Sequence, residues 1–428
     1  MDPSTYFKQF PKVSRKKTTL KAMAFFMDEY NHIDREMNII HVAGTNGKGS
    51  TVKIISNILM KAGYSVGMFI SPHLIRYNER IQVNNNNITD EEMIQLIEEV
   101  QPKIDQYNKI ADENELSNVT WFDALTIIAL LYFYRKNVDF VVLETGIGGL
   151  FDRTNIVENP IVSVITSIGF DHMKLLGSTL EDIAYQKAGI IKKESETVLF
   201  EQIPSVNKVF IDKCKEEKNK LHILKEKDIK DYSFNDEYQF FSYKSYKNLK
   251  TNLKGKVQIK NSMLAIEAIE VIQKKGFKIT KEALREGLAT VTNPGRMETI
   301  YDNPKIIYDG AHNIPAIENL LEMINMYYPD KDKTYVVSIL TRKKYDTMIE
   351  ILSQDKNARF IFTSGNNDEE FTSKEILYDC AKNVIPEEKI EMMDLEKALR
   401  TVIKEGQLTF VIGSFHMYKL VRDILRKR

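Results

Sequence analysis

The sequence predicts an α/β protein of two domains, a larger one with a phosphate-binding loop and a mainly parallel sheet, and a smaller Rossmann-like one. Short apolar, β-prone segments alternate with helical segments, which is typical of a parallel sheet covered on both faces. The 428 residues exceed what one hydrophobic core usually serves. The turn Asn293-Pro294-Gly295 separates two blocks of alternation, so we expect domains over residues 1–295 and 296–428.

The first block begins after a polar N-terminal stretch. Apolar runs that end in glycine, serine or polar residues predict its strands, and apolar residues at helical spacing predict its helices. The predicted strands are Asn38 to Ala43, Ser65 to Ile70, Asp139 to Glu144 and Ile161 to Ser167. The predicted helices are Thr18 to Tyr30, Ser50 to Ala62, Thr89 to Gln106, Thr120 to Arg135, Thr179 to Ile191 and Lys260 to Lys275. Residues 205–258, rich in Lys, Tyr and Asn, are expected to form a helix and surface hairpins.

The second block repeats the alternation. Its predicted strands are Lys305 to Tyr308, Thr334 to Leu340, Arg359 to Thr363 and Leu408 to Ile412. Its predicted helices are Ile314 to Tyr327, Tyr345 to Leu352, and one each after Thr372 and Leu395.

Composition narrows the class of protein. Lys plus Arg equals Asp plus Glu, 60 of each, so no overall basic field favours nucleic acid. The longest apolar run, Leu125 to Tyr134, is far shorter than the roughly 20 residues that a membrane span needs, so it is expected to be a buried helix. Residues 1–17 lack the apolar core of a signal peptide, and the two cysteines suit a reducing cytosol. We therefore expect a cytoplasmic protein without membrane or nucleic-acid partners.

The stretch from Gly44 to Thr51 carries the strongest chemical signal. A buried strand leads into Gly44, Thr45, Asn46, Gly47, Lys48, Gly49, Ser50 and Thr51, and a helix follows at once. In such a loop, backbone N–H groups at a helix N-terminus bind phosphates and the lysine reaches the outer ones. The first domain is therefore predicted to be a phosphate-loop ATPase domain. The alternative is a glycine turn that only caps a helix.

Three polar residues lie at or just past the carboxyl ends of predicted strands: Ser71, Glu144 and His172. Ligands collect at the carboxyl ends of parallel strands, and these side chains could hold Mg²⁺ beside phosphates. Taken singly, they also fit a turn residue before proline, a helix-dipole partner and a satisfied polar residue. Lys187, within a predicted helix, would usually be a solvated charge.

The second block has two segments of the same kind. Asp309-Gly310-Ala311-His312-Asn313 ends a strand and opens a helix, and Gly413-Ser414 follows the last strand. Both are ligand-facing positions by the strand-end rule. For the first segment, the alternative is an ordinary helix cap by Asn313.

Together these segments resemble the folylpolyglutamate synthase/dihydrofolate synthase family, a branch of the Mur-type amide ligases. The stretch 41–50, with its intervening Gly49, looks like the family's phosphate loop. Residues 71–74 with 78–81 are similar to its second signature. Further matches run in the family's order from about residue 18 to the C-terminus: 144–149, 152, 154–155, 166–172, 187–192, 258, 261, 295–296, 309–313 and 413–414.

The resemblance implies an ATP-binding central domain, a C-terminal glutamate-ligase domain and a role for each site residue. Ser71, Glu144 and His172 would hold Mg²⁺, and Lys187 would be carbamylated to serve a second Mg²⁺. Asn261, Arg296 and Asp309 would contact ATP together with the loop. His312 and Ser414 would lie near glutamate; Lys48, Lys187, His172 and His312 would be the catalytic set.

The implied reaction joins L-glutamate to a pterin carboxylate of dihydropteroate, tetrahydrofolate or both. The carboxylate attacks the γ-phosphate of ATP, and the α-amine of glutamate attacks the resulting acyl phosphate. Lys48 and Mg²⁺ would neutralise the two anions that meet, and domain closure would exclude water. Small-molecule substrates and a monomer are expected.

Several residues depart from the family's pattern: Leu150, Arg153, Asp123 and the segment 341–344. They leave the choice of pterin open. Two alternatives also stay open, a Mur-type ligase acting on another carboxylate and a phosphate-loop nucleotide-binding regulator. The extra Gly49 argues against the cell-wall ligases, and the absence of a guanine-specifying Asn-Lys-x-Asp argues against a GTPase switch.

Overall fold

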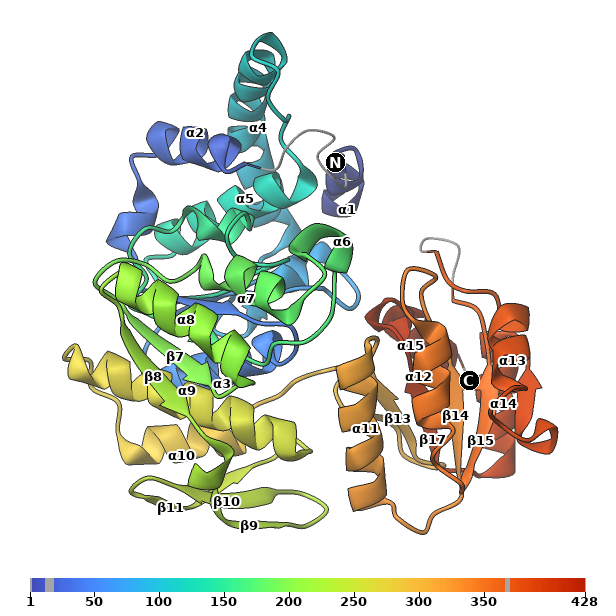
Figure 1. Ribbon diagram of the computed structural model, residues 1–428. Coiled ribbons are helices and arrows are strands. Elements are labelled where there is room, and N and C mark those ends of the chain that lie inside the picture. Colours follow the sequence, from blue (N-terminus) through green and yellow to red (C-terminus); the bar gives the residue numbers. More distant parts are fainter. Residues whose placement is uncertain (1, 12–18, 366–369, 428) are drawn as a thin grey trace. The chain divides into compact units, whose positions relative to one another are not determined.

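A computed structural model describes residues 2–11, 19–365 and 370–427. The chain forms two compact units (Figure 1). The first comprises residues 1–252 and 258–291, and the second comprises residues 253–257 and 292–428. The short stretch 253–257 thus joins the second unit although it precedes the last helices of the first.

The first unit contains an eight-stranded sheet with the order β4-β3-β2-β5-β1-β6-β7-β8. Strands β2, β5, β1, β6, β7 and β8 are parallel, and the hairpin strands β3 and β4 are antiparallel. The bounds are β1 Ile39–Ala43, β2 Val66–Phe69, β3 Ile81–Val83, β4 Asn86–Asn87, β5 Phe140–Glu144, β6 Val162–Ile165, β7 Glu196–Phe200 and β8 Lys220–Leu224. The predicted mainly parallel sheet is confirmed, but β3, β4, β7 and β8 were not predicted.

Strand β1 occupies the middle of this sheet, and all five of its residues are buried. Its one polar side chain, His41, is hydrogen-bonded to Thr154. It pairs with β5 on one side and β6 on the other, with Val42 opposite Glu144 and Ala43 opposite Ile165. The register brings the ends of three strands to one edge of the sheet. The loop after β1 therefore starts between the loops that follow β5 and β6.

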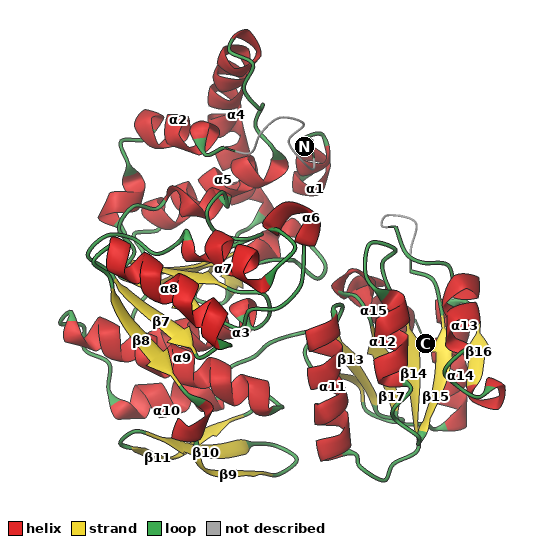
Figure 2. Cartoon of the chain, viewed as in Figure 1, coloured by secondary structure: helices red, strands yellow, loops and turns green. Residues whose placement is uncertain are grey.

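Helices flank the strands of the first unit (Figure 2). They are α1 Pro3–Lys8, α2 Lys21–Glu29, α3 Lys48–Lys61, α4 Asp90–Glu113, α5 Trp121–Arg135, α6 Met173–Leu176, α7 Leu180–Ala188, α8 Pro204–Glu216, α9 Lys256–Lys274 and α10 Lys281–Ala289. The predicted buried helix is confirmed as α5. Helix α4 continues through Pro102, beyond its predicted end at Gln106. Thr18, the predicted start of α2, lies outside the described residues.

Helix α10, which was not predicted, packs on α3, the helix that follows the phosphate loop. A Cβ at Gly287 would come within 2.6 Å of the Cα of Ile58, so only glycine allows this approach. The Asn57 side-chain amide donates to the Gly287 carbonyl at 2.8 Å. This contact fixes the position of α3.

In the region 205–258, helix α8 and a three-stranded antiparallel sheet match the expected helix and surface hairpins, but β8 instead adds a parallel strand to the main sheet. The sheet consists of β9 Lys230–Phe234, β10 Gln239–Tyr243 and β11 Tyr246–Thr251.

The second unit is a six-stranded sheet with the order β12-β13-β17-β14-β15-β16. Only the edge strand β12 is antiparallel to its neighbour. Its strands are β12 Glu298–Tyr301, β13 Ile306–Asp309, β14 Lys333–Val337, β15 Ala358–Phe362, β16 Ile390–Met392 and β17 Thr409–Ile412. Its helices are α11 Ile314–Tyr327, α12 Tyr345–Leu352, α13 Lys374–Ala381, α14 Leu395–Glu405 and α15 Tyr418–Arg426. The predicted second α/β domain is confirmed.

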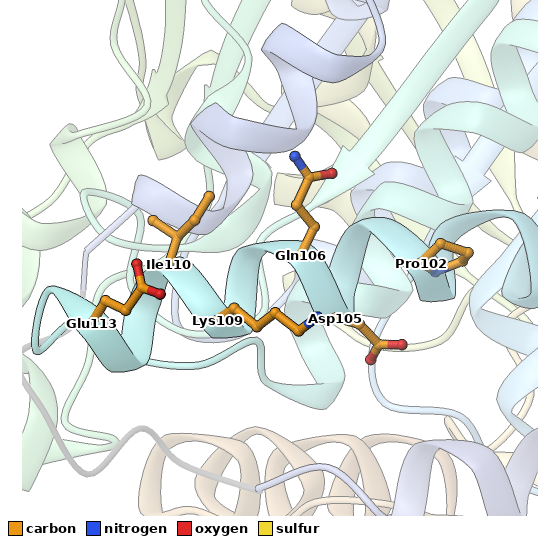
Figure 3. A pocket seen from close by; sticks show the side chains of 6 residues that line it. All are labelled: Pro102, Asp105, Gln106, Lys109, Ile110 and Glu113. Carbon is orange, nitrogen blue, oxygen red and sulfur yellow. The ribbon is translucent and has the colours of Figure 1, made fainter.

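A shallow surface hollow lies along helix α4 (Figure 3). Six residues of this one helix line it: Pro102, Asp105, Gln106, Lys109, Ile110 and Glu113. None of these six residues belongs to the predicted site. Within the described part of the chain, no helix has the length and apolar character needed to cross a lipid bilayer.

Candidate active site

The phosphate loop connects β1 to α3, as predicted. Gly47 precedes α3 with φ of 90°, a left-handed conformation that glycine adopts without strain. The two glycines before Lys48 also lack space for a side chain. A Cβ at Gly44 would come within 1.7 Å of Thr166 Oγ1, and one at Gly47 within 2.5 Å of Asn261 Oδ1. Both positions therefore require glycine, for reasons beyond helix capping.

The turn after β6 holds this loop in place. The backbone N–H of Thr45 donates to the carbonyl of Ser167 at 2.7 Å. In return, the hydroxyls of Thr166 and Ser167 donate to the carbonyl of Asn46 at 2.7 and 3.1 Å. Thr45 Oγ1 also bonds both the carbonyl and the N–H of Gly169, each at 3.0 Å. The turn after β6 thus pre-organises the phosphate loop.

Two lysines converge on one carbonyl oxygen of the loop. Lys48 Nζ donates to the Gly44 carbonyl at 3.2 Å, and Lys187 Nζ from α7 donates to the same oxygen at 2.7 Å. Lys187 is only 3% exposed, so its usual interpretation as a solvated charge is wrong. Burial and the nearby Lys48 lower the pKa of Lys187 to about 7, against the attraction of Asp171 and Asp152. Close to neutral pH, a substantial share of this lysine is therefore an uncharged amine.

Glu144 and Ser71 lie together at the edge of the sheet. The Ser71 N–H donates to Glu144 Oε2 at 3.0 Å, and the Ser71-Pro72 peptide is cis. Glu144 is 3% exposed. A Cβ at Gly49 would be 3.4 Å from Glu144 Oε2, which places this carboxylate beside the first turn of α3. A buried carboxylate beside Ser71 and the phosphate loop matches what Mg²⁺ needs from a protein that leaves other positions to phosphate and water.

His172 lies at the start of α6, in a left-handed conformation with φ of 50°. Its N–H donates to Asp171 Oδ1 at 2.9 Å, and its side chain is 40% exposed. Among the described residues, no three His, Cys, Asp or Glu side chains form a metal-binding group by themselves. The hydrogen bond from the Ser71 N–H brings Ser71 and Glu144 together, and the place of His172 in a metal site stays a prediction.

Asn261 of α9 lies against the loop, as the close approach to Gly47 shows. Its side-chain amide donates to Gln258 Oε1 at 3.0 Å, which fixes its orientation.

In the second unit, Arg296 and Asp309 lie close together. The Asp309 carboxylate accepts the N–H groups of Met297 and Ala311, each at 2.9 Å, and lies 3.8 Å from the guanidinium of Arg296. Burial raises the pKa of Asp309, while Arg296 and the two N–H groups oppose this shift. The guanidinium of Arg296 also covers the ring of Phe415 at 4.5 Å.

His312 and Ser414 lie near the same ring. His312 Nδ1 is 2.8 Å from the Gly310 carbonyl, so Nδ1 carries the proton and Nε2 is left as an acceptor in the neutral ring. The rings of His312 and Phe415 meet edge-on at 5.8 Å. Ser414 is 1% exposed, and its hydroxyl accepts the N–H of His416 at 3.1 Å. Asn313 caps α11, so this part of the alternative interpretation also holds.

A buried chain of hydrogen bonds from β1 was not predicted. His41 Nε2 is 2.8 Å from Thr154 Oγ1, and Thr154 donates to Asp152 Oδ1 at 2.5 Å. The other Asp152 oxygen accepts the Ile147 N–H at 2.8 Å, within the glycine-rich loop after β5. Burial lowers the pKa of His41 to about 3, so the ring is neutral and donates from Nε2. The matches at positions 152 and 154 were the only signal for this chain in the sequence.

Comparison with known proteins identifies the family. Residues 42–269 match the Mur ligase middle domain, and residues 295–415 match the Mur ligase glutamate ligase domain. A dihydrofolate synthase/folylpolyglutamate synthase of Bacillus subtilis is 35% identical over 420 residues, which covers 96% of this chain and 95% of that protein. This chain belongs to the dihydrofolate synthase/folylpolyglutamate synthase family of Mur ligases. The predicted family and enzyme class are thereby confirmed.

Solved structures agree with this membership. Folylpolyglutamate synthase of Thermotoga maritima has a TM-score of 0.85 and 28% identity, and it covers 99% of this chain and 96% of that one. The Mycobacterium tuberculosis folylpolyglutamate synthase has a TM-score of 0.90 at 23% identity over 99% of this chain and 98% of that one, and it supports the fold alone.

Two departures from the family's pattern form a pair. Arg153 Nε lies 2.7 Å from Asp123 Oδ1, with both side chains largely buried. Arg153 also donates to the Thr19 carbonyl at 3.1 Å. Burial raises the pKa of Asp123, and Arg153 and Thr120 oppose the rise. The two unusual residues thus compensate each other, beside the buried chain that ends at Asp152.

Substitution Gly47→Ala separates the two reasons for glycine in this folylpolyglutamate synthase family loop. The left-handed backbone should cost about 1–2 kcal/mol of stability, as it should at Gly63→Ala, where φ is 91° and no atom lies within 4 Å of the added Cβ. Only Gly47→Ala should also weaken ADP binding, by about tenfold or more, because its Cβ displaces Asn261. Calorimetry and thermal unfolding measure both. Equal ADP affinities of the two variants would contradict the prediction.

Proposed function

We propose that this protein is an ATP-dependent ligase that adds L-glutamate to the carboxylate of a pterin, dihydropteroate or tetrahydrofolate or both, through an acyl phosphate. The observation that carries this proposal is the pairing of the Gly49-containing phosphate loop with Glu144 and Lys187. Relatives that cover nearly the whole chain are named for the same two activities.

ATP is the proposed phosphoryl donor. A folylpolyglutamate synthase that is 26% identical was solved with AMPPCP, and the Escherichia coli protein, also 26% identical, with ADP. We assign the phosphates to the N–H groups of residues 44–51 and to Lys48, and we assign further ATP contacts to Asn261, Arg296 and Asp309. The Lys48 ammonium bonds to loop carbonyls at 3.2 and 3.4 Å, long contacts that phosphate oxygens can replace.

The first step has to overcome the electrostatic repulsion between two anions. A carboxylate must approach the γ-phosphate, and cationic groups in a water-poor site reduce the repulsion between them. Lys48 supplies one such group. We assign two Mg²⁺ ions to Ser71, Glu144, His172 and a carbamylated Lys187. Bound there, Mg²⁺ would supply positive charge at the transferring phosphoryl group.

Lys187 suits carbamylation because the reaction needs an uncharged amine. The nitrogen attacks the carbon of CO₂ and loses a proton, and the product is an anionic carbamate. A carbamate can ligate a cation, whereas an ammonium cannot. Lys48 and the bound metal would offset its negative charge.

The second step needs an uncharged α-amine of glutamate. His312 presents Nε2 as a proton acceptor because Nδ1–H is committed to the Gly310 carbonyl. We therefore assign His312 as the group that accepts a proton from the amine, and Ser414 as a contact near glutamate. A monomer located in the cytoplasm stays a prediction.

Turnover in the presence of each pterin tests this function. ADP formation from ATP, Mg²⁺ and glutamate should rise severalfold on addition of dihydropteroate, tetrahydrofolate or both, and Lys48→Ala should abolish it because the γ-phosphate charge is then uncompensated. Lys61→Ala, on the surface of the same helix, serves as the control. If neither pterin stimulated turnover, a Mur-type ligase for another carboxylate would be favoured. If no carboxylate substrate stimulated turnover, a nucleotide-binding regulator would be favoured.

Carbamylation of Lys187 can be observed directly. With ¹³C-bicarbonate, the protein should show a carbamate carbon signal that is absent from Lys187→Ala, and that variant should lose glutamate-dependent ADP formation. The exposed Lys193→Ala variant is the control. Full activity of Lys187→Ala, or the same carbamate signal in Lys187→Ala and Lys193→Ala, would contradict the assignment.

A further inference from the structure

Arg296 lies in a tight turn whose two neighbouring N–H groups are each bound by a carboxylate. The Gly295 N–H donates to Glu298 Oε2 at 2.7 Å, and the Met297 N–H donates to Asp309 Oδ2 at 2.9 Å. The turn is further tied to the strand end because the Gly310 N–H donates to the Gly295 carbonyl at 2.9 Å. Met297 has a positive φ of 45°, which is unfavourable for a residue with a side chain, so the turn has a backbone that needs such support.

Glu298 is itself held by the last helix. The Tyr418 hydroxyl lies 3.0 and 2.9 Å from the two carboxylate oxygens and shares its one proton between them, and Arg422 donates to Oε1 at 3.1 Å. Neither the predicted nucleotide contacts nor the predicted metal ligands include any of these three residues. The carboxylate is only about a quarter exposed, so the ion pair with Arg422 is partly shielded from water.

Residues near the C-terminus also contact the side chain of Arg296. Phe415, three residues before Tyr418, lies under the guanidinium at 4.5 Å. Tyr418 packs edge-on against Tyr308 at 5.1 Å, and the Tyr308 hydroxyl donates to the Ser414 carbonyl. The segment 414–422 therefore supports both the backbone of the arginine turn and the plane of its side chain.

We propose that Glu298, held by Tyr418 and Arg422, is a positioning residue that presents Arg296 to the nucleotide. The proposal rests on the proposed function, in which Arg296 contacts ATP. An arginine that binds phosphate must hold its planar fork in one orientation, and a free side chain loses rotamer entropy when it does so. Supporting its turn from outside reduces this loss, so Glu298 acts through Arg296 and touches no substrate.

Glu298→Ala should raise the KM for ATP by about tenfold or more, the usual effect of losing one charge-assisted hydrogen bond, and leave the KM for the pterin unchanged. ADP affinity by calorimetry should fall by a similar factor. Glu298→Gln keeps an oxygen that accepts the Gly295 N–H and should recover most of the affinity. Tyr418→Phe, a milder change, should lie between Glu298→Ala and wild type. Glu396→Ala is the matched control, because it removes an exposed Arg400 pair of the same unit.

The decisive comparison places Glu298→Ala in an Arg296→Ala background. If Glu298 acts through Arg296, it should then change the ATP KM and the ADP affinity by less than about twofold. The same loss in both backgrounds would show a merely structural role and overturn the proposal, as would Arg296→Ala with wild-type values. Calorimetry needs no pterin, so a wrong acceptor substrate would appear only in the turnover data, whereas a wrong role for Glu298 would appear in both.

Discussion

The carbonyl oxygen of Gly44 accepts hydrogen bonds from two lysines, and the rest of the site depends on this contact. It holds the ammonium of Lys187 close to that of Lys48, and it turns the start of the phosphate loop toward α7. Burial penalises the charged form of Lys187, and the nearby positive charge of Lys48 adds to this effect. The pKa of Lys187 therefore falls to about 7, while Lys48 remains available to phosphate.

The parallel sheet makes this convergence feasible. Strands β5, β1 and β6 are neighbours, so Glu144, the phosphate loop and the turn at Thr166 meet at one edge. Close packing then imposes glycine at Gly44 and Gly47. The hydroxyls of Thr166 and Ser167 hold the loop through the Asn46 carbonyl. Such pre-organisation lowers the cost of holding a triphosphate.

Local patterns in the sequence predicted the fold class and most elements, because buried strands and amphipathic helices have distinct periods. Helix α11 was predicted with its observed bounds, Ile314–Tyr327, since Asn313 and Pro315 mark its start. Strands β7 and β8 were missed because polar residues interrupt their apolar runs: β7 begins with Glu196, and β8 begins with Lys220 and has His222 at its centre. Helix α10 was missed since its small residues, such as Gly287, make sense only against α3.

The sequence identified the candidate site residues, but it did not predict their burial or their hydrogen-bond partners. The sequence shows a lysine at position 187, but its partner is the Gly44 carbonyl, 143 residues away, and local patterns do not reveal such a contact. The Asp123–Arg153 pair and the Glu298–Tyr418 contact likewise join distant positions. His172 stays a prediction as a metal ligand; its backbone N–H donates to Asp171.

Transfer of ¹⁸O from the substrate carboxylate to phosphate tests the central claim most directly. A pterin labelled at both carboxylate oxygens, incubated with ATP, Mg²⁺, glutamate and the protein, should yield inorganic phosphate that carries one ¹⁸O and an amide that retains the other. This follows because the carboxylate attacks the γ-phosphate and the acyl–oxygen bond then breaks. Amide product accompanied by unlabelled phosphate, or by label in AMP, would contradict an acyl-phosphate mechanism.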